Sequence, residues 1–255
     1  MSDTRAGDAR DEIEAATDRT ASRQSGEPHD STMTSRLNWL RAGVLGANDG
    51  IVSTAGVVVG FAGATSNRGA IILAGIAALA AGALSMAAGE YVSVSTQRDS
   101  ERALIKLERQ ELHDDPDGEL AELAEMYEHK GLSRDLARQV AVELTAKDPL
   151  SAHADIELGI DPDDLTNPWA AAGASMGAFI VGALLPLLTI TFAPEHLRTM
   201  VTFTAVALAL VLTGWASARL GRSPVPRAIA RNVVGGLLAM VITYVIGAVV
   251  GLNLA

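Results

Sequence analysis

The stretch AIILAGIAALAAGALSMAAGEYVSVSTQRDSERALIKLERQELHDDP, residues 70–116, decides the fold of this chain. Its first part, residues 70–89, has no charged side chain and matches the roughly 20 apolar residues that a helix needs to cross a bilayer. Residues 92–112 contain neither Gly nor Pro and keep apolar side chains such as Leu104 and Leu107 at helical spacing. We therefore expect one long helix that leaves the membrane and ends just before the proline.

Four further apolar runs have the length of membrane spans. They cover residues 42–64, 169–194, 200–218 and 232–255. Only the first contains a charged side chain, that of Asp49. The chain is 49% hydrophobic but only 4% aromatic, and its apolar residues are grouped in these runs instead of being spread at the periodicity of a soluble core. The sequence predicts an all-α, polytopic membrane protein with five transmembrane helices.

The rest of the chain is polar and contains no cysteine, so disulfides and thiolate metal sites are excluded. We expect a disordered cytosolic tail over residues 1–35, two spans over 36–97, an acidic cytosolic metal-binding domain over 98–166, and three spans over 167–255. The first 35 residues lack the apolar stretch of a signal peptide. A net charge of −10 argues against nucleic acid as a partner.

The arginines predict the orientation of the spans. Arg36 and Arg41 precede the first span, and Arg219, Arg222, Arg227 and Arg231 lie between the fourth and fifth. The two remaining loops have one arginine each, Arg68 and Arg198. Because cytosolic loops are enriched in Lys and Arg, we expect the N-terminus, the acidic insert and the last loop in the cytosol and the C-terminus outside the cell membrane.

Two carboxylates lie in or at the ends of the spans. A charge near the bilayer centre costs about 2.5–3.5 kcal/mol on the insertion scale, so Asp49 needs a function or a hydrogen-bonding partner to offset that cost. Its neighbours Asn48 and Ser53 leave a purely structural role open. Glu90 closes the second span one turn after Met86, and an interfacial position without function is the alternative for it.

Glycines recur on the spans at intervals that favour close helix packing. Gly75, Gly82 and Gly89 are seven residues apart, and Gly56/Gly60, Gly173/Gly177 and Gly247/Gly251 have the small-xxx-small spacing. We interpret these glycines as packing positions and assign them no chemistry.

The insert is strongly acidic: 19 of the 30 Asp and Glu residues lie between residues 97 and 166, against 8 Lys and Arg. Helices are predicted over residues 117–130, 133–147 and 150–158, separated by Gly131 and Pro149 and ended by Gly159. Candidate ligands recur at i,i+3 or i,i+4 spacing: Glu108/Glu111, Glu119/Glu122 and His153/Glu157. Antiparallel packing of these helices would bring the side chains together.

Carboxylates and an imidazole from several bundle helices are the ligands of di-iron and di-manganese proteins, and they suit Fe(II) and Mn(II). The insert therefore predicts a binding site for a divalent metal ion and no prosthetic group. The alternative is that these residues form solvated helix faces without any ligand role. Metal ions, protons and the lipid bilayer are the partners that this interpretation requires.

The chain resembles the vacuolar iron transporter family from about residue 37 to residue 254. The resemblance rests on NDGIVS (48–53), SMAAGEYVS (85–93), IELG (156–159) and the two Glu-x-x-Glu pairs. It implies a five-span homodimeric exchanger, not an enzyme, that moves Fe(II) and often Mn(II) out of the cytosol against protons.

For individual residues the resemblance implies that Asp49 and Met86 line the ion path, while Glu108, Glu111, Glu119, Glu122 and Glu157 gather metal. Plant members of the family carry a Met-Met pair where this chain has His153-Ala154. A ligand role for His153 is thus an inference from this chain alone, as is an assisting role for Glu90 in the path. A membrane-anchored metal sensor or storage module without transport is the alternative function, and Asp49 distinguishes the two because an anchor needs no carboxylate in a span.

Overall fold

The computed structural model describes residues 31–254, and within this range every regular element is helical. The membrane helices are α2 (Ser31–Ala64), α3 (Arg68–Asp114), α7 (Pro168–Phe192), α8 (Arg198–Leu220) and α9 (Val225–Leu254). Between α3 and α7 lie α4 (Pro116–His129), α5 (Arg134–Lys147), α6 (Pro149–His153) and a π-helical turn, η1 (Ala154–Leu158). The expected tail falls largely on residues 1–30, outside the described range, and residues 31–35 belong to α2.

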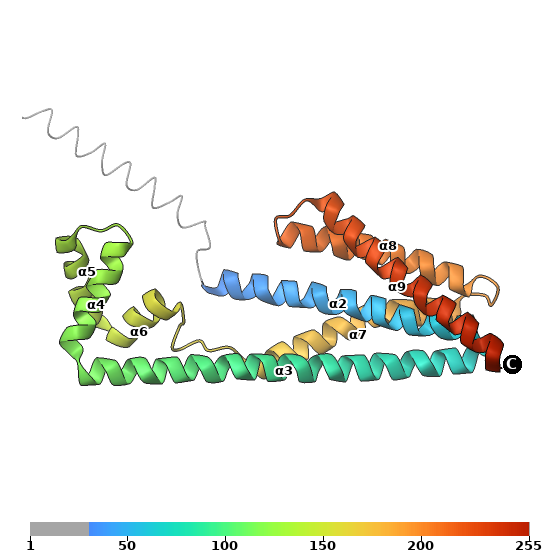
Figure 1. Cartoon of the computed structure of the whole chain (residues 1–255), viewed down its shortest axis with the longest axis horizontal. Helices are drawn as coiled ribbons and strands as arrows, with labels where there is room; N and C mark the ends of the chain where they lie inside the picture. Colours follow the sequence, from blue (N-terminus) through green and yellow to red (C-terminus); the bar gives the residue numbers. More distant parts are fainter. Residues whose placement is uncertain (1–30, 255) are drawn as a thin grey trace, which may run out of the picture.

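The long helix α3 carries the acidic insert away from the membrane helices. Its 47 residues correspond to about 70 Å at 1.5 Å per residue, whereas the hydrocarbon core of a bilayer is about 30 Å thick. Figure 1 shows α4, α5 and α6 gathered at one end of α3 and the other long helices gathered along the other end. The uninterrupted helix predicted from residues 70–116 is therefore confirmed, and it ends at Asp114.

Five helices of the described chain are long and apolar enough to cross a membrane, as predicted. Helix α2 lies at the centre of the group and contacts α3, α7, α8 and α9 (Figure 1). Side chains of α2, including Ile51, Ala55, Val58 and Val59, form the main buried cluster together with residues of α3, α7, α8 and α9. The core thus lies against the helix that carries Asp49.

Glycine contacts explain how α2 approaches its neighbours so closely. A Cβ at Gly247 would lie 1.9 Å from the carbonyl oxygen of Gly60, and one at Gly182 would lie 2.0 Å from that of Ala47. Gly75 and Gly82 likewise face side chains of neighbouring helices, with less than 3 Å of room for a Cβ. At Gly89, Gly173 and Gly177, however, no described atom lies within 4 Å of such a Cβ, so packing within the described chain does not explain these three glycines.

The extracytosolic end predicted for the bundle is held together by its two arginines. Arg198 donates to the carbonyl oxygens of Ser66 and Thr65 at 3.2 and 3.4 Å, and Arg68 donates to that of Ala193 at 2.9 Å. These bonds satisfy carbonyls at or just beyond the C-terminal ends of α2 and α7, where no helical partner remains.

Candidate metal sites

The insert folds as sequence reasoning predicted, with one exception. Asp115 caps α4 by accepting from the backbone N–H of Gly118 at 3.0 Å, and Asp148 caps α6 by accepting from that of Ser151 at 3.1 Å. A buried cluster that includes Leu123, Ala124 and Ala141 joins α4 to α5. The exception is the last predicted helix of the insert, which changes from α-helical to π-helical after His153. The spacing of apolar residues in a sequence does not reveal such a π-bulge. Bulges of this kind are frequent at functional sites.

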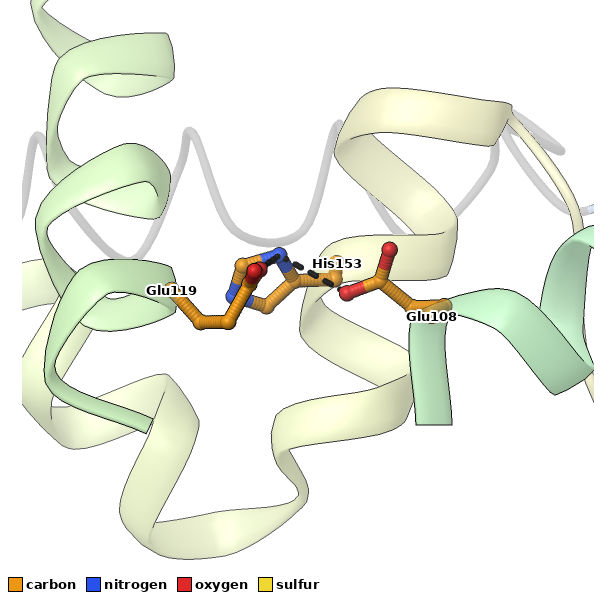
Figure 2. A group of neighbouring side chains, drawn as sticks. All are labelled: Glu108, Glu119 and His153. Atoms are coloured by element: carbon orange, nitrogen blue, oxygen red, sulfur yellow. Dashed lines mark ion pairs between the residues drawn. The ribbon is translucent and has the colours of Figure 1, made fainter. Parts of the chain in front are cut away.

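Three candidate ligands meet in the interior of the insert, each from a different helix. His153 Nδ1 lies 3.1 Å from Glu108 Oε1 and 3.6 Å from Glu119 Oε2 (Figure 2). One ligand atom from each of the three side chains falls within 4.8 Å of the other two. The exposed fractions are 0% for His153, 3% for Glu108 and 13% for Glu119. We call these three residues the insert cluster.

The insert cluster has hydrogen-bonding capacity that the described chain leaves unused. Both imidazole nitrogens of His153 and Oε1 of Glu108 are buried without a hydrogen-bond partner among the described atoms. Buried polar atoms in proteins nearly always have partners, so three such atoms in one place need an explanation. A bound cation would satisfy the carboxylates and one imidazole nitrogen together.

Burial and charge repulsion shift the pKa values in the insert cluster. Burial, followed by the nearby carboxylates of Glu157 and Glu119, raises the pKa of Glu108 to about 7. Burial and the carboxylate of Glu122 raise the pKa of Glu119. Burial lowers the pKa of His153, against the opposing effect of Glu157 and Glu122. Near neutral pH the imidazole is therefore neutral, as metal coordination requires.

The three remaining glutamates of the predicted ligand set surround the insert cluster from the solvent side. Glu111, Glu122 and Glu157 are exposed, yet each lies close enough to shift the pKa of Glu108 or Glu119. Glu108 and Glu111 lie on one side of α3 at i,i+3 spacing, and of the two only Glu108 is buried. The structure brings the predicted residues to one place as an inner set of three and an outer set of three.

The predicted path residues lie apart from the insert, in the membrane helices. Asp49 is exposed on α2 and accepts a hydrogen bond from the Ser53 hydroxyl at 2.9 Å. Met86 is half-buried, and its sulfur accepts from Ser175 Oγ at 3.9 Å. A Cβ at Gly46, one turn before Asp49, would lie 3.6 Å from the methyl carbon of Met86. Met86 therefore lies beside the turn of α2 that leads to Asp49.

Glu90 is partly buried on α3, and no hydrogen bond or ion pair of the described side chains involves it.

Sequence reasoning missed Ser175, which is 4% exposed and contacts Met86. It also missed Thr213 and Asn232, which hydrogen-bond to Asn48. In the sequence these residues could be noticed only as polar side chains in otherwise apolar runs. Which of them pair with each other depends on how the helices are aligned against one another.

Comparisons with known proteins agree with this architecture. The model of the VIT family matches residues 40–248. A vacuolar iron transporter of Acanthamoeba castellanii is 43% identical over 223 residues, which are 87% of this chain and 82% of that protein. Vacuolar iron transporter homolog 3 of Arabidopsis thaliana is 39% identical over 210 residues, 82% of each chain. The family model and these relatives match the chain across nearly all of the membrane helices and the insert. The chain therefore belongs to the VIT family.

Proposed function

We propose that this chain is a membrane transporter that exports Fe(II), Mn(II) or both from the cytosol in exchange for protons. Family membership supports metal-ion transport, and the names of the relatives point to iron. The observation that carries the proposal is the Asp49 carboxylate within a membrane span, near Met86 on the continuous helix that also carries Glu108 of the insert cluster. One rigid helix thus joins a candidate capture site to a candidate path.

The donor set of the insert cluster favours Fe(II) and Mn(II) as cargo. Carboxylate oxygens suit Mn(II), and an imidazole nitrogen adds preference for iron and other transition metals. The exposed Glu111, Glu122 and Glu157 add negative charge around the site and raise the local concentration of cations. His153 stands where plant members have a thioether, so this chain offers an imidazole at that position.

The exposure of Asp49 supports a homodimer as the transporting unit. Its carboxylate lies on a face of α2 that no other part of the described protomer covers. A carboxylate facing lipid is costly, whereas one facing a second copy lines a shared polar path. We therefore place the path between two copies of α2, with Asp49 and Met86 as its ligands and Glu90 near its cytosolic end.

Protons and metal ions compete for the same carboxylates, and this competition supplies the exchange. A carboxylate must lose its proton before it binds metal, and it regains a proton when the metal leaves. Because Asp49 is a carboxylate within a span, it is the group that alternates between the two cargoes. Glu108, whose pKa is raised to about 7, couples capture to pH in the insert.

The proposed orientation rests on the arginines, and interfacial aromatics mark the membrane boundary on the same side. Tyr91 on α3 and Trp169 on α7 have ring centroids 4.7 Å apart, and Arg219 lies 5.5 Å from the Trp215 ring. Aromatic belts mark membrane interfaces, and these residues lie on the arginine-rich side. By the positive-inside rule we assign the insert to the cytosol and the C-terminus to the outside, and we propose the cell membrane as the location.

The second candidate function is a membrane-anchored metal sensor or storage module. The insert cluster favours it, because its three ligands are complete without any membrane residue. Asp49 argues against it, because an anchor has no use for a carboxylate in a span.

A flux measurement separates the two functions. Purified full-length protein in liposomes with an acidic interior should admit Mn(II) or Fe(II) faster than protein-free liposomes, and a protonophore should slow the entry. Metal entry at the same rate with and without the pH gradient would contradict proton coupling. Metal binding without any entry would instead establish the sensor or storage function.

A further inference from the structure

Three polar side chains from three membrane helices form a hydrogen-bonded group beside Asp49. Thr213 Oγ1 on α8 donates to Asn48 Oδ1 on α2 at 3.1 Å, and Asn232 Nδ2 on α9 donates to the same oxygen at 3.3 Å. Asn232 Nδ2 also lies 3.5 Å from Thr213 Oγ1. We call Asn48, Thr213 and Asn232 the amide cluster.

The amide cluster lies at one level of the seam between α2 and α9. One turn further along, Val52 lies against Gly236, where a Cβ would come within 3.2 Å of the valine methyl. The seam then continues through the contact of Gly60 with Gly247. Apolar and glycine contacts let two helices approach closely but are not directional. Directional hydrogen bonds at the first level fix how α2 is turned about its axis.

That rotation decides where Asp49 points. Successive helical residues are about 100° apart, so a helix that turns Asn48 toward α8 and α9 turns Asp49 onto a different face. On the far side, Gly50 lies against the backbone of Phe179 on α7. Between these two covered faces lies the exposed stripe of Leu45, Asp49 and Ser53. A rotation of α2 in either direction would carry Asp49 toward a covered face.

We propose that Asn48, Thr213 and Asn232 are positioning residues, which hold α2 in the rotation that presents the Asp49 carboxylate to the ion path. The inference rests on the proposed function, because it assigns the path to Asp49. In this role the amide cluster neither binds the metal ion nor transfers a proton. It acts only through the position of Asp49. Its loss should therefore weaken metal binding in the path more than it lowers the amount of folded protein.

Mn(II) flux in liposomes tests the proposal with full-length variants. Thr213→Val and Asn232→Leu should raise the half-saturating Mn(II) concentration about three- to tenfold, as expected for losing the hydrogen bond to Asn48. The maximal flux per folded transporter should change by less than about twofold, because uniform binding is what is lost. Thr213→Ser retains the hydroxyl and should restore the wild-type value.

Matched controls come from the same helices. Thr204 on α8 donates only within its own helix, to Met200 O at 2.9 Å, and Asn253 on α9 donates to Val249 O at 2.7 Å. Thr204→Val and Asn253→Leu should leave the half-saturating concentration unchanged. A lower maximal flux at an unchanged half-saturating concentration in Thr213→Val would overturn the proposal, because that result describes a purely structural residue.

A labelling experiment tests whether the amide cluster positions residue 49, even if the protein shows no Mn(II) flux. The chain has no cysteine, so Asp49→Cys introduces the sole thiol. Its rate of modification by a small water-soluble thiol reagent should fall at least about threefold when Thr213→Val or Asn232→Leu is added, in line with the lost hydrogen bond to Asn48. The thiol of Glu125→Cys in the exposed part of α4 should react at an unchanged rate. Equal rates at position 49 would overturn the inference, whereas a wild-type protein without flux would overturn only the transport function.

Discussion

His153 Nδ1 lies 3.1 Å from Glu108 Oε1 in the interior of the insert, and burial moves the two pKa values in opposite directions. The pKa of Glu108 is raised to about 7, so this carboxyl group is partly protonated at neutral pH. The pKa of His153 is lowered, so its imidazole stays neutral. The metal-free pair therefore carries a partial negative charge near pH 7, and a cation competes with a proton for Glu108.

Metal binding should consequently depend on pH through Glu108. Because the pKa of Glu108 is raised, protons compete with metal below about pH 7, and the affinity for Mn(II) should fall from pH 8 to pH 6. His153 contributes little to this change, since its lowered pKa keeps the imidazole neutral. Calorimetric titration of the full-length protein in detergent at pH 6, 7 and 8 measures the effect. Glu108→Gln should bind more weakly and lose most of the pH dependence; an unaltered slope in this variant would contradict the assignment.

The two Glu-x-x-Glu pairs should account for most of the metal bound by the insert. Changing Glu108, Glu111, Glu119 and Glu122 together to Gln should abolish most Mn(II) binding, because it removes one buried ligand, one partly buried ligand and two neighbouring charges. The control changes four exposed carboxylates away from the insert cluster, Glu125, Glu128, Asp135 and Glu143, to Gln. This control loses the same formal charge and should retain most of the affinity. Equal losses in both variants would mean that the insert attracts metal by charge alone.

Sequence reasoning reached the fold because its signals are local. The run over residues 70–116 has helical periodicity and no breaker, and Pro116 and Pro149 mark where the insert helices begin. It also brought Glu108, Glu119 and His153 to one site, since short connections leave few ways to pack such helices.

What the sequence did not reveal depends on contacts between helices. Glu108 and Glu111 look equivalent at i,i+3 spacing, but only the packing of α6 against α3 makes Glu108 the buried one. The pairing of Asn48 with Thr213 and Asn232 likewise depends on the register of α2 against α8 and α9. Such register is a property of the whole bundle and leaves no periodic trace in a single sequence.

The glycine contact between α2 and α9 predicts a pair of opposite stability effects on one helix. Gly247→Ala should destabilise the protein by about 1–3 kcal/mol, because its Cβ would lie 1.9 Å from the carbonyl oxygen of Gly60. Gly235→Ala should be neutral or stabilising by up to about 1 kcal/mol, since alanine favours the helix and no described atom lies within 4 Å. Thermal unfolding in detergent measures both. Equal melting temperatures for the two variants would show that the seam is looser than the structure has it.

Substitution of Asp49 should separate metal flux across the membrane from metal binding by the insert. Asp49→Asn keeps the size and the hydrogen bond to Ser53 but can no longer exchange a proton for a metal ion, so proton-coupled flux in liposomes should fall at least about a hundredfold, the loss typical of removing a proton-transferring group. Mn(II) binding by the insert should be unchanged, because Asp49 lies on α2 and the insert cluster is built from α3, α4 and α6. Ser53→Ala, which removes only the hydrogen-bonding partner, is the matched comparison and should lower flux far less than Asp49→Asn does. Calorimetry and flux on the same preparation check both parts, and an Asp49→Asn protein that transports Mn(II) at the wild-type rate would show that the path lies elsewhere.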